Sequence, residues 1–227
     1  LIPLVKKSLI FQGDMVGDIL SLTYNVTTRK YHWNGEEYDD APDAFKQVGG
    51  MESNAVGKYK ILFADLDGTL IETMSGEIFP KGIWDMKLKF DVLDKIKEMN
   101  PEFLLIVTNQ GGIEKGFVDE NEFQLKSEYV SRAIREYCGC RVHSMYCTSN
   151  DKGNKFRKPN VGMLEVLCAD YIGDDFRCIR SKSLMIGDAS GKPGQFSDSD
   201  RKCAENFGID YLDVEDFLQT VFEEGTI

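Results

Sequence analysis

Two hydrophobic patterns alternate along the chain from residue 58 onward. Apolar runs with the length of buried strands lie at 60–64, 103–107, 142–147, 183–186 and 210–212. Between these runs, apolar residues recur at helical spacing, as in Val92, Leu93, Ile96 and Met99 and again in Phe123, Val130, Ile134 and Tyr137. Strands that alternate with helices predict βαβ units, and therefore an α/β domain with a doubly wound, mostly parallel sheet.

Two further helices are expected at the end of the chain. Ser197 and Asp200 have the spacing of a capping box, which predicts a helix that begins there and ends at Gly208. Asp213 is then expected to cap a last helix, whose apolar side includes Val221.

The first fifty residues have the pattern of strands. Apolar and polar residues alternate over 20–26, and a second run at 29–33 leads into Asn34-Gly35. Because Asn-Gly between two such runs is a strong signal for a tight turn, we expect a β-hairpin here. Gly49-Gly50 is expected to be a flexible joint.

Length and composition favour one main domain with an appendage. The 227 residues are 42% hydrophobic, and we expect a small β-rich segment of unknown role at 1–50 and the main domain at 51–227. No run of 18 apolar residues is present, so no membrane span is expected. None of the six cysteines belongs to a CxxC pair, which favours a reducing compartment, cytoplasmic or, in a eukaryote, nuclear.

Charge is distributed unevenly along the chain. The net charge of −11 argues against a general nucleic-acid coat protein. Residues 151–202 nevertheless hold ten basic and eight acidic residues, with Lys152, Lys155, Arg157 and Lys158 close together. Such a cluster is either a solvated loop or a local positive rim, and the charge pattern leaves both open.

The strand at 60–64 leads into Asp65-Leu66-Asp67-Gly68-Thr69. Residues two apart in an extended segment point the same way. Asp65 and Asp67 are therefore expected to face one pocket at the carboxyl edge of the sheet, where open α/β sheets bind ligands. Two carboxylates so close repel each other unless a cation or a shared proton lies between them.

Three later segments place further polar residues at this edge. Thr108-Asn109 follows the second strand, Arg157-Lys158 precedes a proline, and Gly187-Asp188 follows the fourth strand. The expected site therefore contains Asp65, Asp67, Thr108, Lys158 and Asp188. The three carboxylates suit Mg²⁺, which prefers oxygen ligands, and the threonine and lysine suit a phosphoryl group. A carboxylate that attacks phosphorus forms an aspartyl-phosphate, which water then cleaves.

The order DLDGT, TNQ, RKP and GD resembles the haloacid dehalogenase-like phosphatase superfamily, from residue 58 to about 222. The resemblance implies that Asp65 is the nucleophile, that Asp67 is the general acid/base, and that Thr108 and Lys158 bind the phosphoryl oxygens. It also implies that Asp188, Asp65 and the backbone carbonyl of Asp67 hold Mg²⁺.

A narrower resemblance is to the 3′-phosphatase domain of polynucleotide kinase/phosphatase. It rests on Leu70-Ile71, the segment 75–80, Trp84, Gly162-Met163, and the segments 187–192 and 196–202. It implies a DNA-repair substrate, the 3′-phosphate end of a nucleic acid, with Asn109, Arg157 and Trp84 in contact with substrate beside Thr108 and Lys158. In that family the aspartate at the position of Asp200 lies near the metal site. No kinase phosphate loop, GxxxxGK[ST], occurs in the chain.

Loop lengths predict a site without a cap domain. Only about 20 residues separate Leu70 from the next helix, which is enough for a flap and leaves the site open to a polymer end. Phosphatases of small substrates usually need a cap to exclude water.

Two other functions remain open. The first is a capless phosphatase of histidinol phosphate or of a sugar phosphate such as heptose bisphosphate. Several of those carry a zinc loop of Cys and His before RKP, whereas 148–156 contains neither, and Cys138, Cys140, His143 and Cys147 lie earlier. The second is a non-catalytic end-binding module, against which the intact set of five chemical residues argues.

Overall fold

The computed structural model divides the chain into two compact units, Leu1–Asn54 and Ala55–Ile227. Residues 59–77, 83–173 and 180–222 are described in full, together with the backbone of four strands in the first unit. The expected joint at Gly49-Gly50 and part of the segment 75–80 lie outside the described residues. Within the described residues, no helix combines the length and the apolar character needed to cross a membrane.

The first unit contains an antiparallel sheet with the strands in chain order. The strands are β1 (Lys7–Phe11), β2 (Leu20–Asn25), β3 (Lys30–Trp33) and β4 (Glu36–Tyr38). Trp33 lies opposite Glu36 across β3 and β4, which is the register expected for a hairpin that turns at Asn34-Gly35.

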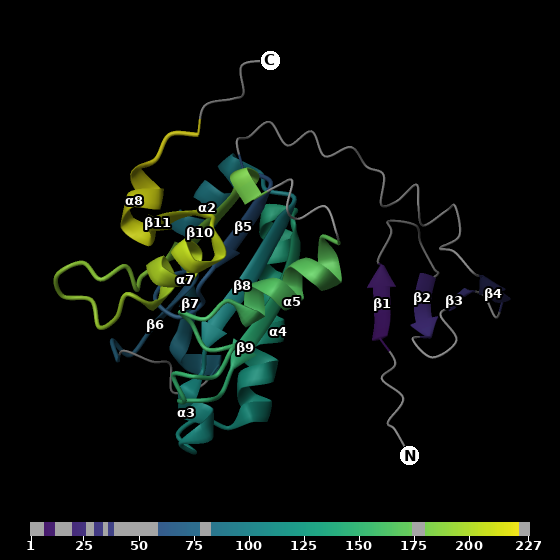
Figure 1. Cartoon of the computed structure of the whole chain (residues 1–227), viewed down its shortest axis with the longest axis horizontal. Coiled ribbons are helices and arrows are strands. Elements are labelled where there is room, and N and C mark those ends of the chain that lie inside the picture. The colour runs from purple at the N-terminus through teal and green to yellow at the C-terminus, as the bar shows by residue number, and fades with distance from the viewer. Residues whose placement is uncertain are drawn as a thin grey trace. The chain divides into compact units, whose positions relative to one another are not determined.

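The second unit is built on a five-stranded parallel sheet with the order β11-β10-β5-β8-β9 (Figure 1). The strands are β5 (Ile61–Ala64), β8 (Phe103–Asn109), β9 (Arg141–Cys147), β10 (Ser183–Gly187) and β11 (Asp210–Asp213). All five lie where the apolar runs predicted strands, which confirms the doubly wound α/β fold. β8 continues through Thr108 and Asn109, because both residues stay paired with β9.

Helices cover both faces of this sheet (Figure 1). They are α2 (Phe90–Met99), α3 (Gly111–Glu114), α4 (Glu120–Cys138), α5 (Gly162–Tyr171), α7 (Ser199–Phe207) and α8 (Val214–Gln219), with 3₁₀ turns η1 (Ile83–Asp85) and η2 (Arg180–Lys182). Leu62 and Ala64 of β5 share a hydrophobic core with α2, α4 and α8. Ile61 and Phe63 share a second core with α5 and α7. Successive strand side chains point to opposite faces, so β5 belongs to both cores.

The helical stripes are confirmed except near helix ends. The predicted apolar residues of α2 are all buried, as are Phe123, Val130 and Ile134 of α4. Tyr137, the last residue of that stripe, is 37% exposed and donates its hydroxyl to Asp94 at 2.5 Å, so the stripe is not buried over its whole predicted length. Val221 lies beyond the end of α8 and is 78% exposed, so its placement on that helix was wrong.

A small flap lies between β5 and α2. β6 (Ile71–Thr73) and β7 (Met86–Leu88) pair antiparallel. The buried carboxylate of Asp85 accepts hydrogen bonds from the backbone amide and the hydroxyl of Ser75, both at 2.7 Å, and so ties the two arms of the flap together. In the described residues before α2 and between β8 and α5 there is no cap domain, as predicted.

Candidate active site

The predicted site residues come together at the carboxyl edge of the parallel sheet. Asp65 follows β5, Thr108 and Asn109 end β8, and Asp188 follows β10. The amide of Asp65 donates to the carbonyl of Ile186 at 3.0 Å, which extends the strand pairing beyond the end of β5.

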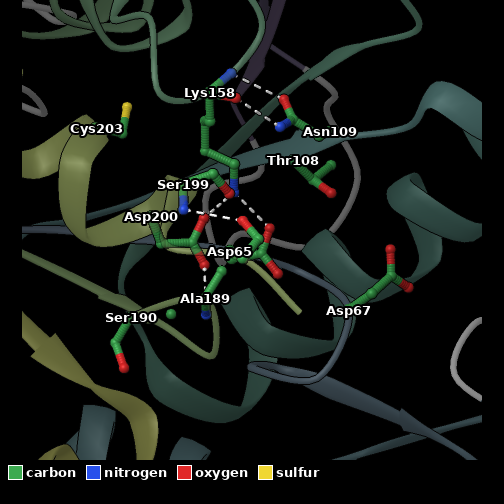
Figure 2. Close-up of polar contacts among 12 residues, drawn as sticks. Asp65, Asp67, Thr108, Asn109, Lys158, Ala189, Ser190, Ser199, Asp200 and Cys203 are labelled. Carbon is green, nitrogen blue, oxygen red and sulfur yellow. Dashed lines mark hydrogen bonds and ion pairs between the residues drawn. The ribbon is translucent and has the colours of Figure 1, made fainter. Parts of the chain in front are cut away.

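Lys158 enters this edge from the loop before α5 and lies between two carboxylates (Figure 2). Its Nζ is 2.5 Å from Asp65 Oδ1 and 2.8 Å from Asp200 Oδ1, and all three residues are buried. Burial acts to lower the pKa of Lys158, but the carboxylates of Asp200 and Asp65 outweigh it and raise that pKa above its ordinary value. The ammonium therefore stays charged.

Three carboxylates form a cluster around this ammonium. One oxygen from each of Asp65, Asp188 and Asp200 lies within 4.8 Å of the other two. Burial raises the pKa of Asp65 well above its ordinary range; Lys158 opposes this effect, and the other two carboxylates add to it. Burial, followed by the charge of Asp200, raises the pKa of Asp188 to about 6. The protein thus holds more negative charge here than one lysine compensates.

This cluster fits a hard divalent cation. Its donors are carboxylate oxygens, the class of ligand that Mg²⁺ prefers, and added positive charge would oppose both the burial and the mutual repulsion that raise the two pKa values. In the described part of the chain, no other group of acidic, histidine and cysteine side chains is placed to hold a metal. Asp67 was predicted to bind the metal through its backbone carbonyl. Its carboxylate is outside the cluster.

Asp67 is held by two other side chains. Gln110 Nε2 donates to Asp67 Oδ2 at 2.7 Å and also to Thr108 Oγ1 at 2.9 Å. Lys126 Nζ, from α4, lies 3.2 Å from Asp67 Oδ1. Figure 2 shows the Asp67 carboxylate apart from the group formed by Lys158, Asp65 and Asp200.

The side chain of Asn109 fixes the backbone of Lys158. Its Oδ1 accepts from the Lys158 amide at 2.9 Å and its Nδ2 donates to the Lys158 carbonyl at 3.0 Å. The role of Asn109 in substrate binding stays a prediction, and these contacts favour a role in placing Lys158.

Trp84 and Arg157 were also predicted to contact substrate. Trp84 is 69% exposed in η1. Arg157 is partly buried and donates to the carbonyl of Ser149 at 2.7 Å. Their contacts with substrate stay predictions.

Two glycines make room for the carboxylates of Asp188 and Asp200. Gly68 has a φ of +85°, and a side chain there would collide with Asp188 Oδ2. A Cβ at Gly187 would likewise collide with Asp200 Oδ2. Both positions require glycine because a carboxylate occupies the space that a Cβ would need.

Sequence reasoning left Gln110 and Lys126 out of the predicted site, and it placed Asp200 near the metal only through the narrower resemblance. Asp200 was interpreted as part of a capping box, which was wrong: α7 has Asp198 as its N-cap, while the Asp200 carboxylate accepts from the Ala189 amide at 3.2 Å and pairs with Lys158. The sequence signal for Lys126 was its position three residues after Phe123, inside the buried stripe of α4.

The fold is shared with a solved phosphatase. The D,D-heptose 1,7-bisphosphate phosphatase of B. bronchiseptica, solved in complex with magnesium and phosphate, matches with a TM-score of 0.53 and 21% identity, over 74% of this chain and 90% of that chain. At this identity the likeness concerns the fold alone.

A family model assigns the chain more specifically than the fold does. The family model "Polynucleotide kinase 3 phosphatase" matches residues 60–218, and the chain belongs to this family. The predicted resemblance and the predicted enzyme class, a phosphatase, are therefore confirmed.

Two curated relatives were compared with the chain. The bifunctional polynucleotide phosphatase/kinase of Schizosaccharomyces pombe is 35% identical over 70% of this chain. An uncharacterized 20.8 kDa protein of Autographa californica nuclear polyhedrosis virus is 30% identical, also over 70% of this chain, and 86% of its own length is covered. The chain spans only 37% of the Schizosaccharomyces pombe protein.

Proposed function

We propose that this protein is a Mg²⁺-dependent phosphomonoesterase that removes 3′-phosphate from nucleic-acid ends, DNA in particular. The observation that carries the proposal is the buried group of Asp65, Lys158 and two further carboxylates at an open sheet edge. Membership of the polynucleotide kinase 3 phosphatase family supports the nucleic-acid substrate.

The chemistry runs in two displacements at phosphorus. Asp65 attacks, and the bond from phosphorus to the 3′-oxygen breaks as the aspartyl-phosphate forms. Asp67 gives a proton to the leaving 3′-oxygen and then takes one from the water that attacks the intermediate. This second displacement releases inorganic phosphate and restores the Asp65 carboxylate.

Side chains around Asp65 would stabilise the negative charge on the phosphoryl oxygens. The ammonium of Lys158, 2.5 Å from the nucleophile, is placed to neutralise one oxygen. Thr108 Oγ1 accepts its bond from Gln110, so its own proton is available for another oxygen. Asp65, Asp188, Asp200 and the backbone carbonyl of Asp67 would hold Mg²⁺, which when bound neutralises charge on the cluster and on the phosphoryl group.

Recognition of the polymer is assigned to Lys152 and Lys155. Of the basic residues near the site, Lys192, Arg201 and Lys202 are engaged in ion pairs with Asp213 and Asp216, Glu205, and Asp198, respectively. Lys152 and Lys155 are exposed and, in the described part of the chain, form no ion pair. They are therefore available to contact backbone phosphates next to the 3′ end.

The test compares kcat/KM for a 3′-phosphorylated oligonucleotide and for a nucleoside 3′-monophosphate over a range of salt. The oligonucleotide should be preferred at low salt, with a shallow salt slope of about −0.7 to −0.9 per phosphate contact. Lys152→Ala with Lys155→Ala should reduce the ratio of kcat/KM for the oligonucleotide to kcat/KM for the monophosphate. Lys60→Ala with Lys182→Ala, at the amino ends of β5 and β10, changes the net charge equally and should leave it intact. Equal efficiency on both substrates at every salt concentration would contradict the nucleic-acid substrate.

The alternative is a small-molecule phosphatase, which the fold shared with the heptose bisphosphate phosphatase supports. Heptose 1,7-bisphosphate and histidinol phosphate belong in the same assay. A kcat/KM for either ester above that for the oligonucleotide would favour the alternative.

A further inference from the structure

Lys126 is a buried cation on α4, a helix that supplies no residue of the predicted site. Its side chain is 8% exposed, and its Nζ lies 3.2 Å from Asp67 Oδ1 and 5.1 Å from the centre of the Phe123 ring. Burying an ammonium costs free energy unless an opposite charge pairs with it. The charge that pairs with it is the carboxylate assigned as the general acid/base.

The two oxygens of Asp67 are therefore held from two sides. Lys126 contacts Oδ1, and Gln110 Nε2 donates to Oδ2 while it also bonds to Thr108. Gln110 and Lys126 are both buried, so neither donor has much freedom to move. Figure 2 draws no contact between the Asp67 carboxylate and Asp65 or Lys158.

We infer that Lys126 is a positioning residue: it fixes the side chain of Asp67, which must carry a proton when it acts as the acid on the leaving oxygen and is a carboxylate again once that proton is transferred. The inference rests on the proposed phosphatase function and extends it to a residue that does not touch the substrate. Proton transfer requires the acid within hydrogen-bond reach of the leaving oxygen, and a misplacement of about 1 Å can cost about 100-fold in rate. Loss of Lys126 should therefore slow the step that needs the proton.

The first displacement provides a readout that a purely structural role would not change. A nucleoside 3′-monophosphate releases an alkoxide, which needs the proton, whereas 4-nitrophenyl phosphate releases a phenolate that needs little help. In single-turnover assays with Mg²⁺, Lys126→Met should slow release of the nucleoside by about 10- to 100-fold. Release of 4-nitrophenol should change by less than about threefold, and Lys126→Arg should recover much of the loss.

A second comparison asks whether Lys126 acts through Asp67. If it does, the double variant Asp67→Asn with Lys126→Met should release the nucleoside no more slowly than Asp67→Asn alone, because both changes then remove the same catalytic contribution. Lys95→Met is the matched control. Lys95 is 14% exposed, pairs with Glu98 on α2 and lies 5.4 Å from the Phe222 ring, and its loss should leave both rates unchanged.

Folding is monitored by the melting temperature, and Lys126→Gln, which keeps a donor without the charge, replaces Lys126→Met if the latter does not fold. Equal slowing of both esters, or additive effects of the Asp67 and Lys126 changes, would overturn the inference while leaving the phosphatase function intact. Wild-type protein that releases phosphate neither from these esters nor from a 3′-phosphorylated oligonucleotide would instead overturn the proposed function itself. Both substrates are monomers, so the outcome does not depend on polymer recognition.

Discussion

Asp65 combines burial, a nearby cation and two neighbouring carboxylates in one residue. Replacing it by asparagine keeps the shape and removes the attacking charge, so Asp65→Asn should reduce kcat by several orders of magnitude. Folding should persist, because Lys158 keeps its partner Asp200 at 2.8 Å and the repulsion within the cluster falls. Phosphate release and the melting temperature measure the two effects. Near-normal turnover of Asp65→Asn would rule out the aspartyl-phosphate mechanism.

The raised pKa of Asp188 predicts that both stability and the proposed Mg²⁺ binding depend on pH. Burial, followed by Asp200, raises its pKa from 3.8 to about 6, so the folded metal-free protein binds a proton more tightly than the unfolded chain does. The free energy of unfolding in a chelator should therefore fall as the pH rises from about 4 to about 6, and this contribution is constant above that range.

Bound Mg²⁺ favours the ionised carboxylates, so the rise in melting temperature that Mg²⁺ produces should increase over the same pH interval. Activity should be lost in the chelator, and Asp188→Asn should raise the Mg²⁺ concentration needed for activity. Thermal melts with and without Mg²⁺ across the interval provide the measurement. Full activity after exhaustive dialysis against the chelator would refute the metal requirement.

At the scale of elements, the turn after β5 and the loop after β10 are packed without spare room. Gly68→Ala combines a strained positive φ, worth about 1–2 kcal/mol, with a collision with Asp188. We expect lower stability and a higher Mg²⁺ requirement, measured by melting and by Mg²⁺ titration of activity.

Gly139→Ala is the control for this substitution. Gly139 ends α4 with a φ of +75° and open space around it, so its replacement brings the backbone strain alone. An identical Mg²⁺ requirement in both variants would show that Asp188 does not depend on the contact with Gly68.

The elements also explain which parts of the site could be predicted. Asp65, Thr108 and Asp188 lie at the ends of apolar strands, and parallel topology brings strand ends together regardless of sequence distance. Lys126 and Asp200 lie on helices, where a charged residue is ordinarily on the solvent side. Their use in the site depends on the packing of α4 and α7 against the sheet, which the local pattern does not encode; for Asp200 the resemblance pointed to the metal site, and for Lys126 nothing did. The apolar stripes failed for a similar reason at Tyr137 and Val221, since helix ends extend beyond the core.

At the scale of the whole molecule, the site residues all belong to the unit Ala55–Ile227. This unit has hydrophobic cores on both faces of its sheet. A chain that begins at Ala55 should therefore fold and retain kcat on a nucleoside 3′-monophosphate within about twofold, a difference of less than about 1 kcal/mol in activation free energy. Steady-state kinetics of the two chains measure this. A large loss of kcat in the shorter chain would assign the first unit a part in catalysis.

The position of β5 has a consequence for how the molecule opens. Amide hydrogens exchange with solvent through local and global openings, and the slowest belong to segments that open only when the whole domain unfolds. β5 is paired on both sides and buried on both faces, so its amides are expected to exchange at that global limit. Asp65 follows this strand directly, and its amide is bonded to β10. Local fluctuations of the flap can therefore occur while Asp65, the proposed nucleophile, remains fixed in the most slowly exchanging part of the domain.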